Sequence, residues 1–299
     1  MAQQSASQRS KLGVKASTLI EKVIVTTIMI VVAALFLIPF FWMISTSLKP
    51  DLKAVFQFPP QWIPNPPAFD NYIKVWQSAP FGRYLLNSIV VAVAGTAFQL
   101  INACLAAYVF ARIKFPGRSL FFILFLAVLM IPSQVIVVPN YIILSRLPDP
   151  FTGEHMLNSY WALILPFIAS AYGTFMIRQA FMTIPNDLVD AAVVDGANHL
   201  GILRNVMLPL TKPMLITFGL LAFNWRWNDY FWPLIMTNSV AMRTLPVGVV
   251  AMRAGAEGGT NWHYIMAATV LVIAPIVLLF SVAQRYFVEG IAYSGLKGV

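Results

Sequence analysis

Four polar side chains stand among aromatic rings in one otherwise apolar segment, "FNWRWNDYFWPLIM". Asn224 and Asn228 are one helical turn apart and can face the same side of a helix, where their amides can hydrogen-bond a polar solute. Arg226 and Asp229 are three residues apart and can instead pair with each other. Ionisable groups inside an apolar span are costly and usually face a pathway or each other. The segment predicts a solute path, with an internal ion pair or an interfacial belt of tryptophans as alternatives.

A second polar stretch, "DAAVVDGANHLGILRNVMLP", interrupts the apolar sequence from Asp190 to Pro209. Just upstream, Asn186 is a possible cap, and Asp187 and Asp190 would lie in the first turn of a helix. Gly196 is expected to end this helix because glycine tolerates left-handed backbone, and a second helix would stop at Pro209. The pattern predicts a helix-turn-helix at the membrane surface, with an ordinary solvated loop as the alternative.

The sequence gives little support to an enzyme or a metal site. The three histidines, His155, His199 and His263, are scattered and do not have the spacing of metal ligands. The sequence has no G-x-x-x-x-G-K-[ST] phosphate loop, so we expect no cofactor in this chain.

The composition indicates an integral membrane protein. The 299 residues are 59% hydrophobic and only 10% charged, whereas soluble domains carry about 25% charged residues. The formal net charge of +9 is therefore interpreted as a signal of membrane topology and not of nucleic-acid binding. A single cysteine, Cys104, excludes an intrachain disulfide.

We predict an all-α fold with six transmembrane helices, because six apolar runs approach the length of about 20 residues that a bilayer requires. The paired prolines Pro132 and Pro139 predict a bend in the third run. The six runs are Val23–Ser47, Tyr84–Ala111, Ser119–Leu144, Tyr160–Ile177, Pro213–Thr237 and Tyr264–Ala283.

The distribution of basic residues predicts that both termini lie inside the cell. In this orientation 12 of the 20 lysine and arginine residues are inside and seven are outside, with Arg226 in the fifth span. The expected organisation is an inside segment over 1–22, a transmembrane domain over 23–284 and an inside tail over 285–299. The polar stretch then belongs to an inside loop of about residues 179–212.

The second polar stretch resembles the EAA loop of permease subunits of binding-protein-dependent ABC importers. Aspartate replaces the usual glutamate and valine the usual isoleucine, and both changes are conservative. The segments "ARIKFPGRSLFF", "FNWRWNDYFWPLIM" and "QRYFVEGIAYSGLKG" are similar to the second permease of carbohydrate importers of the maltose and glycerol-3-phosphate types. The matching positions of the loop are Asp190, Ala191, Ala192, Gly196, Val206, Leu208 and Pro209.

The resemblance implies a role for the loop and a set of partners. The loop would form a coupling helix that docks on a cytoplasmic ATPase dimer, which would bind the ATP. Other expected partners are a second homologous permease and an extracytoplasmic substrate-binding protein, in the bacterial inner membrane. The coupling residues would be Asp190, Ala191, Ala192, Gly196, Leu208 and Pro209.

The resemblance also gives the polar segment a substrate class, a sugar, an oligosaccharide or glycerol-3-phosphate. Asn224, Asn228 and Asp229 would line the path, Trp227 would stack on a sugar, and Arg226 would supply a cation for a phosphate. The Pro-rich first outside loop, interpreted as ordered, and the "RAGAEGGTNWH" loop would contact the binding protein. The alternative is an ion-coupled secondary transporter, which needs more membrane acids than this sequence has.

Overall fold

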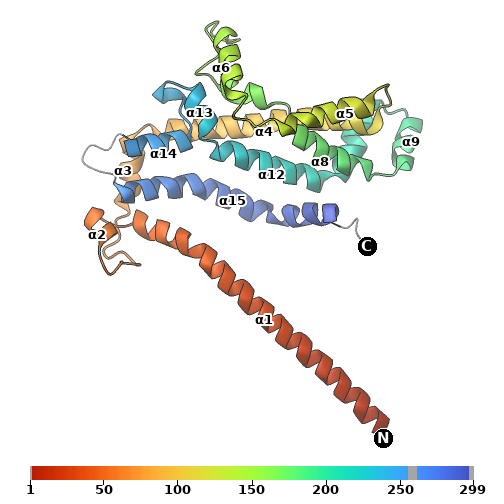
Figure 1. Cartoon of the computed structure of the whole chain (residues 1–299), viewed down its shortest axis with the longest axis horizontal. Coiled ribbons are helices and arrows are strands. Elements are labelled where there is room, and N and C mark those ends of the chain that lie inside the picture. The colour runs from red at the N-terminus through yellow and green to blue at the C-terminus, as the bar shows by residue number, and fades with distance from the viewer. Residues whose placement is uncertain (1, 255–260, 296–299) are drawn as a thin grey trace. The chain divides into compact units, whose positions relative to one another are not determined.

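The protein is all-α, as the sequence predicts (Figure 1). The computed structural model describes residues 2–254 and 261–295, so part of the "RAGAEGGTNWH" loop and the end of the tail lie outside the described residues. The helices are α1 Ala2–Ser47, α2 Leu52–Phe56, α3 Asp70–Ser78, α4 Phe81–Arg112, α5 Arg118–Ala127, α6 Val137–Arg146, α7 Tyr160–Ile164, α8 Ala171–Met182, α9 Asn186–Val194, α10 His199–Ile202, α11 Leu208–Leu210, α12 Lys212–Asn228, α13 Phe231–Met236, α14 Leu245–Ala254 and α15 Trp262–Gly295.

The chain forms two compact units. The first comprises Met1–Lys74 and Gly259–Val270, and the second comprises Val75–Gly258 and Leu271–Val299.

The first unit is built on the long helix α1 and the loop that follows it. The most apolar window of Glu21–Ser47 has no residue buried within the chain, so these side chains are available to lipid. At the end of α1, the Asn71 amide donates hydrogen bonds of 2.8 Å to the carbonyls of Ser47 and Lys49. Lys49 is fully buried, with its Nζ 4.1 Å from the centroid of the Trp42 ring, and burial lowers the pKa of its ammonium group. These contacts hold the loop after α1 in an ordered conformation.

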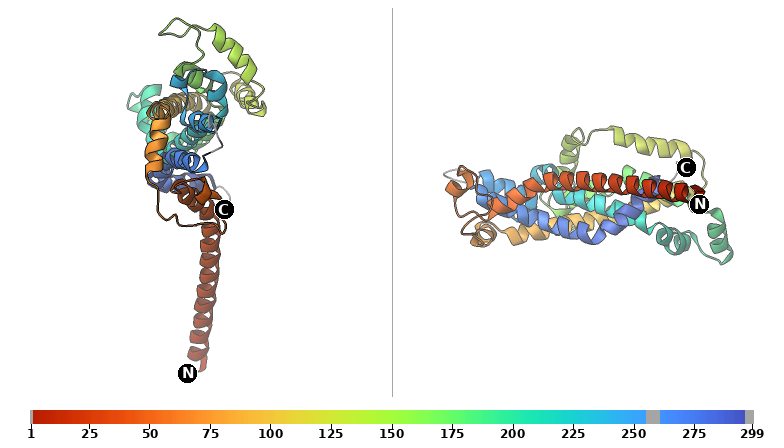
Figure 2. Two further views of the ribbon diagram at one scale, coloured as in Figure 1. Left: turned by 90° about the vertical axis from the view of Figure 1, so that its left-hand side faces the viewer. Right: turned by 90° about the horizontal axis from the view of Figure 1, so that it is seen from below.

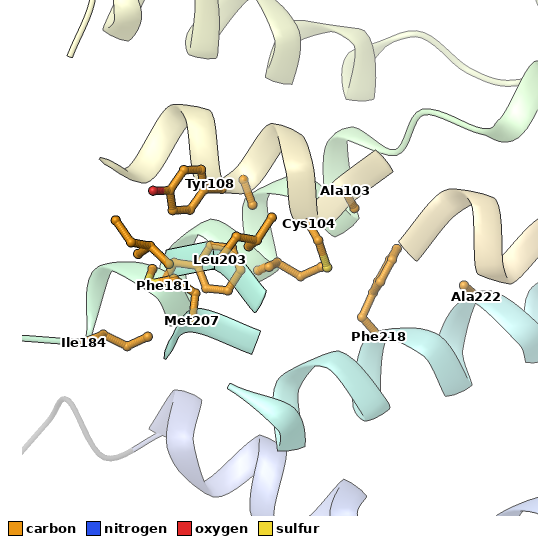
Figure 3. Close-up of a cluster of buried hydrophobic side chains, with 12 residues drawn as sticks. Ala103, Cys104, Tyr108, Phe181, Ile184, Leu203, Met207, Phe218 and Ala222 are labelled. Carbon is orange, nitrogen blue, oxygen red and sulfur yellow. The ribbon is translucent and has the colours of Figure 1, made fainter. Parts of the chain in front are cut away.

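The second unit is organised around α4, which packs along α8 and α12 (Figures 1 and 2). Their contact contains a cluster of buried side chains that extends to the π-helical segment Leu203–Met207 after α10 (Figure 3). Gly173 of α8 has no side chain, and this allows the ring of Phe218 from α12 to pack directly against the backbone of α8. The core therefore fixes α4, α8 and α12 together.

Three described helices are long and apolar enough to cross a membrane, and up to five segments qualify if each bent pair is one span. Two bent pairs are present: Tyr160–Phe167 with Ala171–Met182, at 47°, and His199–Leu210 with Lys212–Trp227, at 84°. The inside location of both termini and the count of six spans remain predictions.

The continuous third helix predicted over Ser119–Leu144 is wrong, although the bend predicted there is confirmed. Ile131 is extended, with φ −87° and ψ 116°, and separates the helical segment Arg118–Met130 from α6. The following residue, Pro132, accounts for the break, because proline disfavours helical backbone in the residue before it. The fifth run is likewise divided, since Asp229 is extended between α12 and α13.

We predict that Gly173→Ala lowers stability by about 1–3 kcal/mol, because the new methyl group would overlap the ring of Phe218. The matched control is Gly219→Ala, since a Cβ added at Gly219 of α12 meets no atom within 4 Å. That control should be neutral or slightly stabilising, as alanine favours helix over glycine. Thermal unfolding of the purified protein in detergent compares the two, and equal midpoints would contradict the packing described for α8.

Candidate functional site

The second polar stretch forms the predicted helix-turn-helix, made of α9 and α10. Gly196 follows the end of α9 with φ +79°, and nothing lies within 4 Å of a Cβ placed there, so its backbone conformation and not crowding favours glycine. The Asn198 side chain then caps α10 by accepting a hydrogen bond of 2.8 Å from the backbone N–H of Gly201.

Three details of this loop differ from the sequence prediction. Asn186 does not cap α9, because its amide oxygen accepts a hydrogen bond of 2.5 Å from Arg112 Nη1 instead. Asp187 lies in the first turn of α9, and Asp190 lies beyond it. The helical segment that begins at His199 ends at Leu210, one residue beyond the predicted stop at Pro209. The sharp change of direction comes at Thr211, between α11 and α12.

The predicted coupling residues divide between an exposed surface and the core. Asp190, Ala191, Gly196 and Pro209 are exposed. Ala192 and Leu208 are half-buried and pack against the core cluster that Figure 3 shows. The exposed surface of α9, its turn and α10 also includes large apolar side chains: Leu188, Val193, Val194 and Leu200. This surface combines exposed apolar groups with three exposed acids, Asp187, Asp190 and Asp195. An exposed apolar patch bordered by polar residues is typical of a site that binds another protein.

A pocket of about 400 Å³ lies in the second unit, where several helices break. Its walls come from α4, from the segment between α5 and α6, and from both sides of the break between α12 and α13. Its polar or aromatic lining residues include Gln99, Ser133, Gln134, Trp225, Arg226 and Asp229. Amides, a hydroxyl, a cation, an acid and an aromatic face can together hold a polar solute that also has apolar faces.

Arg226 and Asp229, two of the predicted path residues, line this pocket, and each has a separate hydrogen-bond partner. Arg226 Nη2 donates a hydrogen bond of 3.2 Å to the carbonyl of Phe167, and its guanidinium lies 4.9 Å from the centroid of the Phe167 ring. Asp229 accepts a hydrogen bond of 3.2 Å from the backbone N–H of Trp232. The alternative in which they form an ion pair on one helical face is not realised among the described residues, because α12 ends at Asn228 and Asp229 is extended. The two opposite charges still attract each other.

Asn224 and Asn228 lie one turn apart as predicted, and Asn228 Nδ2 donates to the Asn224 carbonyl at 2.9 Å and to Asn224 Oδ1 at 3.0 Å. Neither is part of the pocket lining. Trp227 is only 2% exposed and donates from Nε1 to the carbonyl of Val272 at 3.0 Å. The accessible ring is that of Trp225, which is 74% exposed.

Sequence reasoning missed Trp225, Gln99, Ser133 and Gln134. A signal for the last three was present, since each is a polar residue within an apolar run, and such residues usually face the protein interior or a cavity. The sequence does not show that Trp225, and not Trp227, has the accessible ring, because Trp227 is held by a long-range hydrogen bond to the carbonyl of Val272.

Comparison with known proteins agrees with this architecture. A family model described as "Binding-protein-dependent transport system inner membrane component" matches residues 100–293. The sn-glycerol-3-phosphate transport system permease protein UgpE of Yersinia enterocolitica is 34% identical over 273 residues, covering 89% of this chain and 95% of the relative. UgpE of Salmonella typhi is 35% identical over 274 residues, with 90% and 95% covered.

The fold is also similar to that of solved membrane proteins. A chain from the crystal structure of a bacterial ABC transporter involved in the import of the acidic polysaccharide alginate superposes with a TM-score of 0.78 at 24% identity, covering 90% of this chain and 96% of that chain. A second alginate transporter structure, in complex with an alginate pentasaccharide-bound periplasmic protein, gives a TM-score of 0.59 at 14% identity, with 87% and 93% covered.

We predict that Gly196→Val disturbs the turn after α9 by about 1–2 kcal/mol, because a β-branched residue disfavours left-handed backbone. Gly196→Asn is the matched control, since asparagine tolerates this conformation and the space is open. Limited proteolysis of the purified protein would show faster cleavage within 186–202 for the valine variant alone. Equal protection of the two variants would contradict the strained turn.

Proposed function

Because the chain belongs to the family of inner membrane components of binding-protein-dependent transport systems, we propose that it is one permease subunit of an ABC importer for a carbohydrate or polyol derivative. The protein is a multi-pass membrane transport component and not an enzyme. The family and its relatives favour this function over an ion-coupled secondary transporter.

The observation that supports a driven importer is the exposed surface of α9, its turn and α10. The core contacts of Ala192 and Leu208 fix this surface to the membrane helices, while Asp190 and the apolar side chains around it remain available. A surface of this kind fits a groove on a cytoplasmic ATPase, with the acid facing a basic residue there. The sequence has no phosphate loop, so the ATP would be bound by that separate subunit.

The pocket supports the choice of substrate class. The ring of Trp225 offers a flat surface for the C–H face of a sugar, and Arg226, Asp229 and Gln99 offer hydrogen bonds for hydroxyl groups. The named relatives carry sn-glycerol-3-phosphate, and a structural neighbour imports alginate. A sugar, an oligosaccharide or a phosphorylated polyol therefore defines the range of substrates that we propose.

This permease would form half of the path, with a second homologous permease supplying the other half. A substrate-binding protein would deliver the solute to the outside loops, among which the loop after α1 is ordered by Asn71. ATP binding would close the ATPase dimer, displace α9 and α10, and expose the path alternately to the two sides.

The test is affinity purification of the tagged protein from its native membrane in mild detergent, followed by mass spectrometry. Recovery of an ATPase and a second multi-span permease is the expected result. A solitary protein that transports solute in liposomes under an ion gradient would replace the importer with a secondary transporter.

We predict that Asp190→Lys abolishes co-purification of the ATPase, because it reverses the charge of the exposed acid of α9 that belongs to the coupling residues. Glu154→Lys is the control, since it makes the same charge change at an exposed residue outside the loop. Both variants should insert in the membrane at normal levels. Retention of the ATPase by Asp190→Lys would remove this surface as the docking site.

We also predict that Trp225→Ala lowers solute uptake at limiting concentration about twofold to tenfold, since one aromatic contact contributes about 0.5–1.5 kcal/mol. Trp225→Phe keeps a flat ring and should retain most of the uptake. The assay uses vesicles with the assembled transporter and the ligand of its binding protein. Equal uptake by the two variants would place the path elsewhere.

A further inference from the structure

Arg112 is the last residue of α4, and its side chain hydrogen-bonds both the end of α8 and the start of α9. Its Nη2 donates to the carbonyl of Phe181 at 2.7 Å and to that of Ile184 at 2.6 Å, at the end of α8. Its Nη1 donates to Asn186 Oδ1, on the first residue of α9. Carbonyls at a helix end have no partner within the helix, so a cation placed there stabilises them. One side chain thus links α4 to both α8 and α9.

Tyr108 lies one turn earlier on α4 and makes the corresponding contact with α10. Its hydroxyl lies 3.0 Å from Nδ1 of His199, the first residue of α10, and the two rings meet edge to face. Its ring is buried in the cluster that Figure 3 shows, which also contains Leu203 and Met207 of the π-helical segment after α10. Each helix of the loop is therefore held at its first residue by a side chain from α4.

The same helix also reaches the pocket. Gln99 of α4 lines the pocket, and a Cβ added at Gly95 would lie 2.8 Å from Cδ of Arg226, so α4 packs directly on a pocket residue. Arg112 lies 13 positions after Gln99, a separation of about 20 Å along continuous helix without a proline. A displacement of Arg112 would therefore move Gln99 with it.

The covalent connections of the loop to α8 and α12 are less direct than its contacts with α4, because neither connection is a continuous straight helix. The chain leaves α8 through a non-helical segment that ends at Pro185, and α11 meets α12 at a bend of 84°. Bends of this kind absorb movement, because a few backbone dihedrals can change without displacing the helix beyond them.

We propose that Arg112 and Tyr108 are positioning residues that transmit movement of α9 and α10 to the pocket through α4. This inference rests on the proposed function, in which a bound ATPase displaces these two helices. The hydrogen bond between Arg112 and Asn186 is its most specific element, since it joins α4 to α9 alone.

The experiment measures pocket accessibility in the complete transporter, with its second permease and ATPase, in nanodiscs. Ser133→Cys, in a Cys104→Ser background, places one thiol of this chain at the pocket, and mass spectrometry follows its labelling by a charged maleimide with and without ATP and vanadate. The proposal expects a nucleotide-dependent change in labelling rate with Asn186 present. Asn186→Ala should weaken this shift about tenfold, the effect expected for one hydrogen bond to a charged group, while Asn186→Asp should retain it.

Asn186 is exposed, so its variants leave the contacts of Arg112 with α8 in place and should assemble normally. Lys114→Gln is the control, because it removes an exposed cation two residues after Arg112, in the segment between α4 and α5. ATPase recovery and basal ATP hydrolysis should be equal in all variants. A nucleotide response in Asn186→Ala equal to that of Lys114→Gln would overturn the role of the Arg112 contact. Absence of an associated ATPase from the parent protein would instead overturn the proposed function.

Discussion

The constraint on which the second unit depends is that hydrocarbon offers no hydrogen-bond partner to an exposed backbone group. Irregular backbone at membrane depth must therefore be buried in protein or line a cavity. The pocket follows this rule, because Ser133 and Gln134 come from the break after α5, Phe167 from the break before α8, and Asp229 from the break after α12. Two of the polar groups that line the pocket, Arg226 and Asp229, also hydrogen-bond the backbone beside these breaks.

The continuous helix α4 has the opposite role. It has no internal proline. It packs along α8, which begins after a break near Phe167, and along α12, which ends at the break at Asp229. If the inside loop moves, the breaks beside α8 and α12 can bend, whereas the continuous helix α4 would be displaced as a whole. The loop and the pocket lie at different positions along this one helix.

Local signals in the sequence were sufficient to predict the turn at Gly196, the bend at Pro132 and the all-α class, because each depends on the backbone preferences of one or two residues or on composition. The pairing of Arg226 with Asp229 could not be predicted correctly, since the end of α12 separates them. Two tryptophans two residues apart have opposite environments because a carbonyl of α15 holds Trp227. The partners of Arg112 lie 69 to 74 residues away in sequence, so no local pattern indicates them.

The distribution of arginines explains why so apolar a chain keeps these charged groups. Arg226 donates to the carbonyl of Phe167 just before α8, and Arg112 donates to the carbonyls at the end of α8. Arg178, within α8, donates in turn to the carbonyl of Phe110 on α4. A guanidinium has five N–H donors and remains charged in proteins, so it can satisfy several helix-end carbonyls at once. Because Arg226 also lines the pocket, a solute that competes for its donors would loosen the bond that joins α12 to Phe167, at the end of the helical segment that precedes α8.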